Sequence, residues 1–314
     1  MASRVAIAAL FLTLGSLCAC LEYADVDASV AVDAEIWSVD FRGNQVLRFD
    51  LHDGAYLGDL IEREEGGLEE PTDALLGPDG AIYVTAFHTA EVLRYDRSGE
   101  IDVFFDDSRV LEEPVAIRHH DGAFYLLGND TMNMAVLEPE TGAVLDQFGY
   151  HLMRFPHDFA VGRDELIYVA MEWNTTPGMV QVWDPAEGGL VESFSTFHEE
   201  RLPSAIAVGP EGDLYVADWG ANRIDRYDGK TLRWVDTLGH RGRDRLVDPV
   251  SLEFGPDGYL YVATAEGIVS LDVETGEIVA TVVPAGSAGL EWVRRIRIVE
   301  VPRMDRADEP LYPR

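Results

Sequence analysis

The sequence predicts an all-β protein, a six-bladed β-propeller closed by a C-terminal strand that pairs into the first blade. Two observations carry this prediction. A turn such as Gly77-Pro78-Asp79-Gly80 precedes several short segments of alternating apolar residues. Each segment contains an aromatic residue, and the intervals are 46, 42, 43, 47 and 46 residues between Trp37, Tyr83, Tyr125, Tyr168, Tyr215 and Tyr261. A period of about 45 residues built of short strands is typical of propeller blades.

Each repeat contains four predicted strands. In the repeat around Tyr215, residues 204–208 alternate between larger and smaller apolar side chains and predict the inner strand. After the Gly209-Pro210-Glu211-Gly212 turn, three further strands are expected at residues 213–218, 223–227 and 233–238.

The two ends of the chain are predicted to share one blade. The second strand of the blade occurs six times, but an inner strand follows a proline only five times, at Pro71, Pro114, Pro156, Pro203 and Pro249. The first repeat starts directly at its second strand, residues 35–39, and the alternating residues 293–299 lie one period after the last proline. We therefore expect residues 293–299 to pair with residues 35–39, which removes an open sheet edge.

A family resemblance agrees with this architecture. Residues 215–227, Tyr-Val-Ala-Asp-Trp-Gly-Ala-Asn-Arg-Ile-Asp-Arg-Tyr, resemble the repeat core of the NHL-repeat proteins, a family of six-bladed propellers. Residues 239–242 resemble the segment between blades in that family. The resemblance covers residues 35–299 and is strongest in repeats two, five and six. It implies the fold but no particular chemistry, because propellers carry many unrelated functions.

The first 19 residues predict a lipoprotein signal peptide. Arg4 precedes an apolar run at residues 5–17, which is too short to span a bilayer but suits a signal peptide. The run ends in Leu17-Cys18-Ala19-Cys20, which resembles a bacterial lipobox with lipidation at Cys20. An ordinary secretory signal is the alternative. By resemblance to lipoprotein sorting rules, Leu21 favours the outer membrane, so we expect a lipid-anchored protein of the bacterial cell envelope.

The remaining domain organisation follows from composition. Residues 20–34 form an acidic linker, residues 35–302 the propeller and residues 303–314 a polar tail. No cysteine follows Cys20, which excludes disulfides, a thiolate nucleophile and cysteine-based metal sites from the propeller. No later segment is long and apolar enough to predict a transmembrane helix.

The charge balance excludes one class of partner. The chain has 57 acidic and 24 basic residues, a net charge of −33. Such a charge repels nucleic acid and anionic lipid and favours cationic partners or divalent metal ions. The alternative is that the acidic residues serve solubility and are spread over the surface.

Strand direction predicts where a binding site forms. The first residues of every inner strand and the loops between second and third strands converge on one face, at the mouth of the central channel. Three blades supply ionisable residues there, namely Asp73, His157 with Asp158, and Arg294 with Arg295. This cluster could bind a polar ligand or a cation, since channel mouths suit ligands. Alternatively, the two carboxylates bond backbone amides or arginines and fix one blade to the next.

Loop residues add further candidates on the same face. Trp173, Trp219 and Asn222 come from loops between second and third strands, where exposed aromatic residues suit recognition. Arg241 and Arg243 belong to the one concentrated basic patch and could bind a carboxylate or a phosphate. Alternatively, the tryptophans cover gaps between blades and the arginines neutralise nearby acids.

The leading functional hypothesis is a binding module that presents its channel-mouth face to a protein, peptide or glycan. We assign no catalytic residue and no metal ligand, since the sequence contains no Gly-x-Ser-x-Gly and no assembled catalytic group. A purely structural envelope protein is a further possibility.

The alternative hypothesis is a metal-dependent lyase or hydrolase with its ion in the channel. The segment around His157 is similar to one in the propeller lyases that cleave peptidyl-hydroxyglycine, but a single histidine does not make a three-ligand zinc site. Lactonase-type propellers of similar shape hold calcium. Asp73, Asp158 and Asn129 could supply oxygen ligands for Ca²⁺ in the same way.

Overall fold

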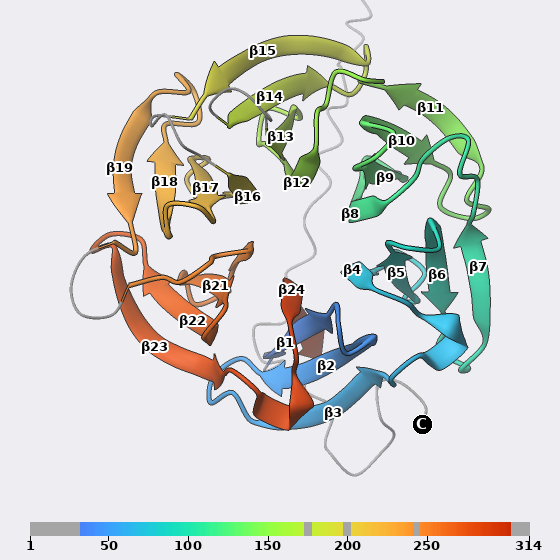
Figure 1. Ribbon diagram of the computed structural model, residues 1–314, viewed down its shortest axis with the longest axis horizontal. Helices are drawn as coiled ribbons and strands as arrows, with labels where there is room; N and C mark the ends of the chain where they lie inside the picture. Colours follow the sequence, from blue (N-terminus) through green and yellow to red (C-terminus); the bar gives the residue numbers. More distant parts are fainter. Residues whose placement is uncertain (1–31, 173–177, 197–201, 241–244, 303–314) are drawn as a thin grey trace, which may run out of the picture. The chain divides into compact units, whose positions relative to one another are not determined.

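The computed structural model describes residues 32–172, 178–196, 202–240 and 245–302. Within these residues, twenty-four strands form six four-stranded antiparallel sheets, and there is no α-helix. Figure 1 shows the sheets as blades arranged in a ring, with one inner strand of each blade facing the centre. The chain is therefore a six-bladed β-propeller, as its sequence predicts.

The first three blades, each given from its inner strand outward, have the following bounds. Blade 1 consists of β24 (Val293–Pro302), β1 (Val32–Asp40), β2 (Gln45–Asp50) and β3 (Tyr56–Ile61). Blade 2 consists of β4 (Pro71–Leu76), β5 (Ile82–Ala86), β6 (Glu91–Tyr95) and β7 (Ile101–Phe105). Blade 3 consists of β8 (Pro114–His120), β9 (Ala123–Gly128), β10 (Asn133–Leu137) and β11 (Val144–Phe148).

The other three blades follow the same order. Blade 4 consists of β12 (Pro156–Val161), β13 (Ile167–Met171), β14 (Met179–Asp184) and β15 (Gly189–Ser195). Blade 5 consists of β16 (Pro203–Val208), β17 (Leu214–Asp218), β18 (Arg223–Tyr227) and β19 (Trp234–Leu238). Blade 6 consists of β20 (Ser251–Phe254), β21 (Leu260–Thr264), β22 (Gly267–Asp272) and β23 (Glu277–Pro284). Two short 3₁₀ turns lie at Glu65–Gly67 and Ser287–Gly289.

The C-terminal strand closes the ring. Strand β24 pairs antiparallel with β1, and residues 295–299 lie opposite residues 35–39. This pairing confirms the predicted closure. The paired segment is longer than the sequence predicts, because the register continues outward to Val32 opposite Pro302.

The recurring turn is hydrogen-bonded to the recurring tyrosine. The hydroxyl of Tyr168 donates to Oδ2 of Asp164 at 2.8 Å, and that of Tyr261 donates to Oδ2 of Asp257 at 2.7 Å. Gly80 ends the equivalent turn of blade 2 with φ of 78°, a conformation that residues with a side chain rarely adopt. The most visible sequence repeat therefore serves the fold.

Apolar clusters between neighbouring blades form the core. Phe49 of blade 1 packs in one cluster with Val283 of blade 6, and Tyr125 of blade 3 packs in another with Trp183 of blade 4. Each of the six blade interfaces contains such a cluster. Because the apolar core lies between blades, side chains that face the central channel are free to be polar.

A β-bulge at the start of the inner strands directs side chains to one face. In blade 2 the backbone register passes from Pro71 to Asp73, so Thr72 lies opposite no residue of β5 in the strand pairing. The same shift skips four equivalent residues, Val115, His157, Ser204 and Arg294. A bulge turns the extra residue out of the regular alternation. The residue after each proline position can therefore point to the channel mouth while the next residue points inward.

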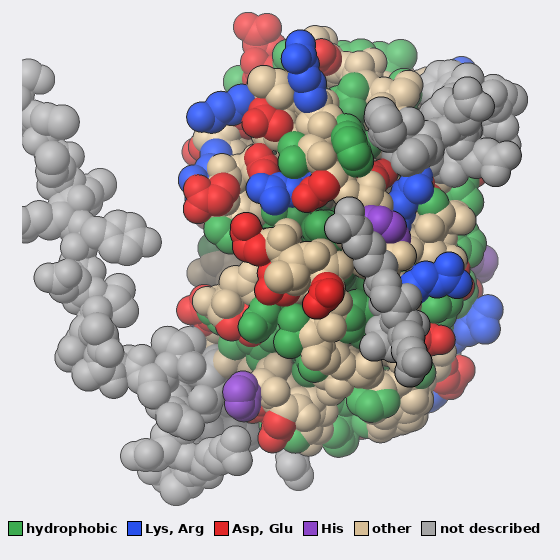
Figure 2. All heavy atoms as spheres, turned by 90° about the vertical axis from the view of Figure 1, so that its left-hand side faces the viewer, with side chains coloured by type: hydrophobic (Ala, Val, Ile, Leu, Met, Phe, Trp, Pro, Cys, Tyr) green, Lys and Arg blue, Asp and Glu red, His purple; other side chains and the backbone are tan. Residues whose placement is uncertain are grey.

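The surface charge is dispersed over the side of the ring shown in Figure 2. Acidic side chains are spread over this face, with arginine or lysine side chains between them. This distribution agrees with the solubility interpretation of the acidic excess on that side. In the described part of the chain, no helix has the length and apolar character needed to cross a membrane.

Candidate functional site

A pocket of about 480 Å³ opens at the channel mouth. Five of its lining residues occupy the position after the proline that begins or precedes an inner strand, or the equivalent position in blade 1: Thr72, His157, Ser204, Val250 and Arg294. Other lining residues come from the loops that strand direction places on this face, such as Trp219 and Trp292. We call this the mouth pocket. Its lining shows that the ring gathers segments distant in sequence into one cavity.

Aromatic rings form the walls of the mouth pocket. The ring centroid of Phe41 lies 6.1 Å from that of Phe87 and 5.6 Å from that of Trp292, and both pairs are edge-to-face. Trp292 is 41% exposed, and Trp219, on the loop of blade 5, is 45% exposed. Partly exposed indole rings offer a flat surface on which an apolar group can be buried. The mouth pocket is therefore suited to binding an apolar group of a ligand.

Among these aromatic residues, only Trp219 was predicted from the sequence. Phe41 and Phe87 follow the second strands of blades 1 and 2, so the strand-direction argument, applied to every loop, would have placed them on the same face. Trp292 immediately precedes the closing strand β24 and is found in the same way.

His157 contributes a neutral imidazole to the mouth pocket. Its Nε2 lies 3.4 Å from Oε2 of Glu172. Burial lowers the pKa of His157 from its ordinary value of 6.5, and nearby Arg294 lowers it further, while Glu172 acts in the opposite direction. The pKa of Glu172 is in turn lowered by its hydrogen bond with His157. At neutral pH the pocket therefore contains an uncharged histidine beside a carboxylate.

Arg294 is the cation of the mouth pocket. Its side chain is half-buried, and no residue that the structure describes lies within hydrogen-bond or ion-pair distance of its guanidinium group. Burial, together with the neighbouring charge of Arg295, lowers the pKa of Arg294 to about 10. The group is still protonated at neutral pH. A half-buried guanidinium without an anionic partner can bind a negatively charged group of a ligand.

The second level of the channel, below the mouth pocket, is an ionic network. Asp73 is completely buried, and its Oδ2 lies 2.6 Å from Nη2 of Arg297 and 2.7 Å from Nη1 of Arg118. The same oxygen accepts the backbone N–H of Ile117 in the next blade at 3.0 Å. Burial alone would raise the pKa of Asp73, but Arg297, Arg118 and Arg295 together hold it below its ordinary value.

Asp158 is bound in an equivalent way. It is also completely buried, and its Oδ1 accepts from Nη2 of Arg118 at 2.8 Å. Its Oδ2 lies 2.5 Å from Nη1 of Arg295 and accepts the N–H of Ile206 in the next blade at 3.1 Å. Inner strands have no further strand beside them, so their buried N–H groups need such acceptors. Both carboxylates therefore connect neighbouring blades, which is the structural alternative stated above.

His157 does not join this network with its side chain. Arg295 reaches it only through the backbone, donating from Nη2 to the carbonyl oxygen of His157 at 3.3 Å. The predicted cluster is therefore divided. Asp73, Asp158 and Arg295 lie inside the channel, whereas the side chains of His157 and Arg294 line the mouth pocket.

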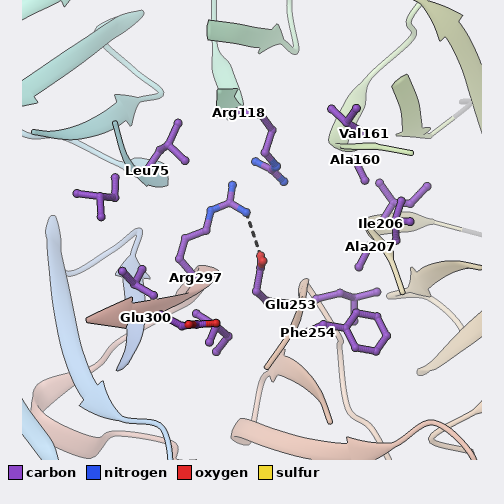
Figure 3. Close-up of a pocket in the computed structure, with 15 residues that line it drawn as sticks. Leu75, Arg118, Ala160, Val161, Ile206, Ala207, Glu253, Phe254, Arg297 and Glu300 are labelled. Carbon is purple, nitrogen blue, oxygen red and sulfur yellow. Dashed lines mark hydrogen bonds and ion pairs between the residues drawn. The ribbon is translucent and has the colours of Figure 1, made fainter. Parts of the chain in front are cut away.

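The third level of the channel contains charged residues that the sequence analysis missed. Arg118, Glu253 and Arg297 line a second cavity of about 500 Å³ at the far ends of the inner strands (Figure 3). Arg297 Nη1 lies 3.0 Å from Oε2 of Glu253, and Figure 3 marks this pair with a dashed line. All three residues stand two positions after an inward-facing residue of the same strand. The period-two alternation of a strand is the signal that could have found them.

A calcium or zinc ion does not fit the second level of the channel. The oxygens of Asp73 and Asp158 accept hydrogen bonds from arginines and backbone amides. Asn129 directs its Nδ2 to the carbonyl oxygen of Pro156 at 2.9 Å. Over the described ranges, no three or more His, Cys, Asp or Glu residues form a group that could hold a metal ion. Three positive guanidinium groups would also repel a cation there.

The remaining predicted residues are divided between described and undescribed segments. Asn222 is exposed, and its Oδ1 accepts the backbone N–H of Asp248 at 2.7 Å, which connects two loops of the mouth face. Cys20, Trp173, Arg241 and Arg243 lie outside the described residues. Their proposed roles in lipidation and binding stay predictions.

Comparisons of the sequence give no family. No protein-family model matches the chain, and a comparison with curated proteins finds no match.

Comparison of the fold finds other six-bladed propellers. A protein of unknown function from Bacteroides caccae has a TM-score of 0.66 at 15% identity, covering 86% of this chain and 99% of that one. A chain of the nidogen/laminin complex has a TM-score of 0.65 at 14% identity, covering 84% and 98%. A streptogramin B lyase has a TM-score of 0.58 at 17% identity, covering 73% and 72%. At these identities the likeness shows the fold alone.

Proposed function

We propose that this chain is a binding module whose ligand enters the mouth pocket. The observation that carries the proposal is the lining of that pocket, where Trp219 and Trp292 keep exposed ring surface beside the half-buried Arg294. A cavity of about 480 Å³ lies within the range of ligand sites in proteins, roughly 300–1,000 Å³. Mostly apolar walls with a small number of polar or charged groups are the usual composition of such sites.

The metal-dependent lyase or hydrolase is less well supported. Its predicted ion site would need the oxygens of Asp73 and Asp158, and arginines already occupy them. The streptogramin B lyase shares the fold with this chain, but at this identity the likeness is no evidence of a shared reaction. The similar chain from the nidogen/laminin complex is an example of a propeller in a protein complex, which suits a protein or peptide as ligand. A glycan is the other ligand type that fits an aromatic wall.

We also propose that the module is an NHL-type propeller held at a bacterial membrane by lipidation of Cys20. Support comes from the repeat resemblance at residues 215–227 and from the lipobox-like residues 17–20. Residues 21–31 join the anchor to β1 and reach at most about 40 Å when fully extended. Val32, where the linker joins β1, would then lie within this distance of the membrane.

The proposal is tested with a fragment library screened by ligand-observed NMR. Wild-type protein is compared with a Trp219→Ala, Trp292→Ala double variant, which removes both exposed rings of the mouth pocket. We expect a set of aromatic fragments to bind the wild type and to lose binding in the double variant. Trp234→Ala is the matched control, because Trp234 is 40% exposed but lies on the outer strand β19.

Two results would overturn the binding proposal. One is a wild-type protein that binds no fragment at millimolar concentration. The other is a set of fragments that bind the double variant as well as they bind the wild type. Either result would place the function elsewhere on the molecule.

A further inference from the structure

We propose that the mouth pocket selects a carboxylate carried on an aromatic or similarly flat apolar group, with Arg294 as the partner of the carboxylate. This inference rests on the proposed function, since it names the ligand class of the same pocket.

The charged residues along the channel are nearly balanced. The ionic network contains three arginines, Arg118, Arg295 and Arg297, and three carboxylates, Asp73, Asp158 and Glu253. Positive and negative charges in it are therefore equal in number. Arg294 adds one positive charge outside the network. Asp158 and Asp73 act on it only at longer range, and no described carboxylate lies within ion-pair distance of its guanidinium group. A buried or half-buried charge favours an opposite charge beside it, so a single anion completes the site.

The shape of the guanidinium group of Arg294 favours a carboxylate as its partner. The planar guanidinium of arginine donates two parallel hydrogen bonds to a carboxylate, which a point charge such as an ammonium cannot do. Arg294 belongs to the same pocket as the exposed rings of Trp219 and Trp292. An anion bound at Arg294 therefore carries the rest of its molecule past these rings. A flat apolar group gains most from that contact.

Acidic residues at the pocket rim favour a compact anion with a single charge. Half-buried Asp248 lines the same pocket from the loop that precedes the inner strand of blade 6. Glu291, from the loop before the inner strand of blade 1, adds less because it is exposed and paired with Arg63. The whole protein is also strongly acidic. These charges oppose phosphate esters and acidic glycans, whose several charges extend toward the carboxylates. A monoanion that reaches Arg294 avoids most of this repulsion.

Arg42 is the other cation at the pocket, and its position is different. It is exposed, and its guanidinium carbon lies 4.5 Å from the centre of the Trp292 ring. A cation at an exposed site is screened by water and salt, so it discriminates weakly between ligands. We therefore assign the selection to Arg294.

Three small probes of the same shape test the inference: phenylpropanoate, its primary amide and phenylpropylamine. Binding is followed by protein-observed NMR and by tryptophan fluorescence. For the wild type we expect the order carboxylate, amide, amine, from tightest to weakest. In Arg294→Gln we expect the affinity for the carboxylate to fall about 10-fold or more. The affinity for the amide should change less than about 2-fold, because the rings are unchanged.

Two further variants sharpen the test. Arg294→Lys keeps the charge and loses the planar pair of donors, so it should retain part of the preference for the carboxylate. Arg97→Gln removes one positive charge on the opposite face, where Arg97 donates to the carbonyl oxygen of Gly80, and should leave all three affinities unchanged. Thermal unfolding of each variant confirms that the propeller is intact.

The outcomes separate the two proposals. Suppose that fragments bind, but the wild type binds the carboxylate and the amide with equal affinity, or Arg294→Gln still prefers the carboxylate. The proposed ligand class is then wrong, whereas the proposed binding function is not. If Arg42→Gln abolishes the preference instead, the assignment to Arg294 is wrong. If no probe and no fragment binds, the binding module itself is wrong.

Discussion

Asp73 of blade 2 binds Arg297 of the closing strand β24, with Oδ2 of Asp73 2.6 Å from Nη2 of Arg297. These residues are 224 positions apart in the chain. Strand β24 is therefore held by two kinds of contact, backbone pairing to β1 and a buried ion pair to blade 2. The ionic network below the mouth pocket therefore helps to close the ring.

Removal of the Asp73 charge is predicted to destabilise the propeller strongly. Asp73→Asn keeps the size of the side chain but leaves Arg297 and Arg118 without a buried counter-charge. Breaking one side of a buried ion pair costs about 3–5 kcal/mol. Urea unfolding followed by circular dichroism measures the change. Arg63→Gln is the control, since its pair with Glu291 is about half exposed, and it should cost less than about 1 kcal/mol.

The pH dependence of the same pair has a definite sign. The pKa of Asp73 is lower in the folded protein than its ordinary value of 3.8. Its contribution to stability is therefore fully present above that value and is lost as the pH falls through the lower folded pKa. The stability difference between wild type and Asp73→Asn should shrink on acidification below pH 3.8. A difference that stays constant into strong acid would contradict the ion-pair account.

The hydrogen bond between the tyrosine and the turn aspartate is predicted to stabilise the propeller, and only in blades whose turn contains that aspartate. Tyr261→Phe removes a hydroxyl that donates to the Asp257 carboxylate at 2.7 Å, and should cost about 1 kcal/mol. Blade 5 supplies the matched control, because Glu211 replaces the aspartate of the turn there. The hydroxyl of Tyr215 donates to no side chain or backbone group of the described residues, so Tyr215→Phe should be nearly neutral. Equal costs for both variants in urea unfolding would show that the hydrogen bond does not matter.

Periodicity made most of the fold predictable. The recurrence of Tyr215 and its equivalents depends on local turn and strand chemistry, so it is visible in the sequence. The pairing of β24 with β1 could be predicted because the count of inner strands was one short. The three-residue extension to Val32 and Pro302 could not, since it depends on two strand ends that meet only after the ring has closed.

The site was predictable in location more than in detail. Strand direction placed His157 and Arg294 at the channel mouth, where the structure has them. It did not separate them from Asp158, because the bulge at residue 157 is a property of the pairing and not of residue type. The partners Arg118 and Arg297 were not predicted, because they lie beyond the first two residues of their inner strands.

Cys20 is predicted to hold the protein at the membrane. Cys20→Ala should move the protein from the membrane fraction to the soluble fraction of its host, since no lipid can be attached. Cys18→Ala is the matched control two positions earlier and should stay in the membrane fraction. Mass spectrometry of the N-terminal peptide checks for the lipid directly. A Cys20→Ala protein that remains with membranes would remove lipidation as the anchor.

His157 is predicted to titrate below its ordinary pKa of 6.5, because its surroundings disfavour the charged ring. Burial and Arg294 lower its pKa, whereas Glu172 and Asp158 raise it. Glu172→Gln should therefore lower the NMR titration midpoint of the His157 ring further. By linkage, the unfolded chain binds more protons between the two pKa values, so wild-type stability falls relative to His157→Gln as the pH drops below 6.5. A midpoint above 6.5 would mean that the carboxylates outweigh burial, and an upward shift in Glu172→Gln would mean that Glu172 does not stabilise the charged ring.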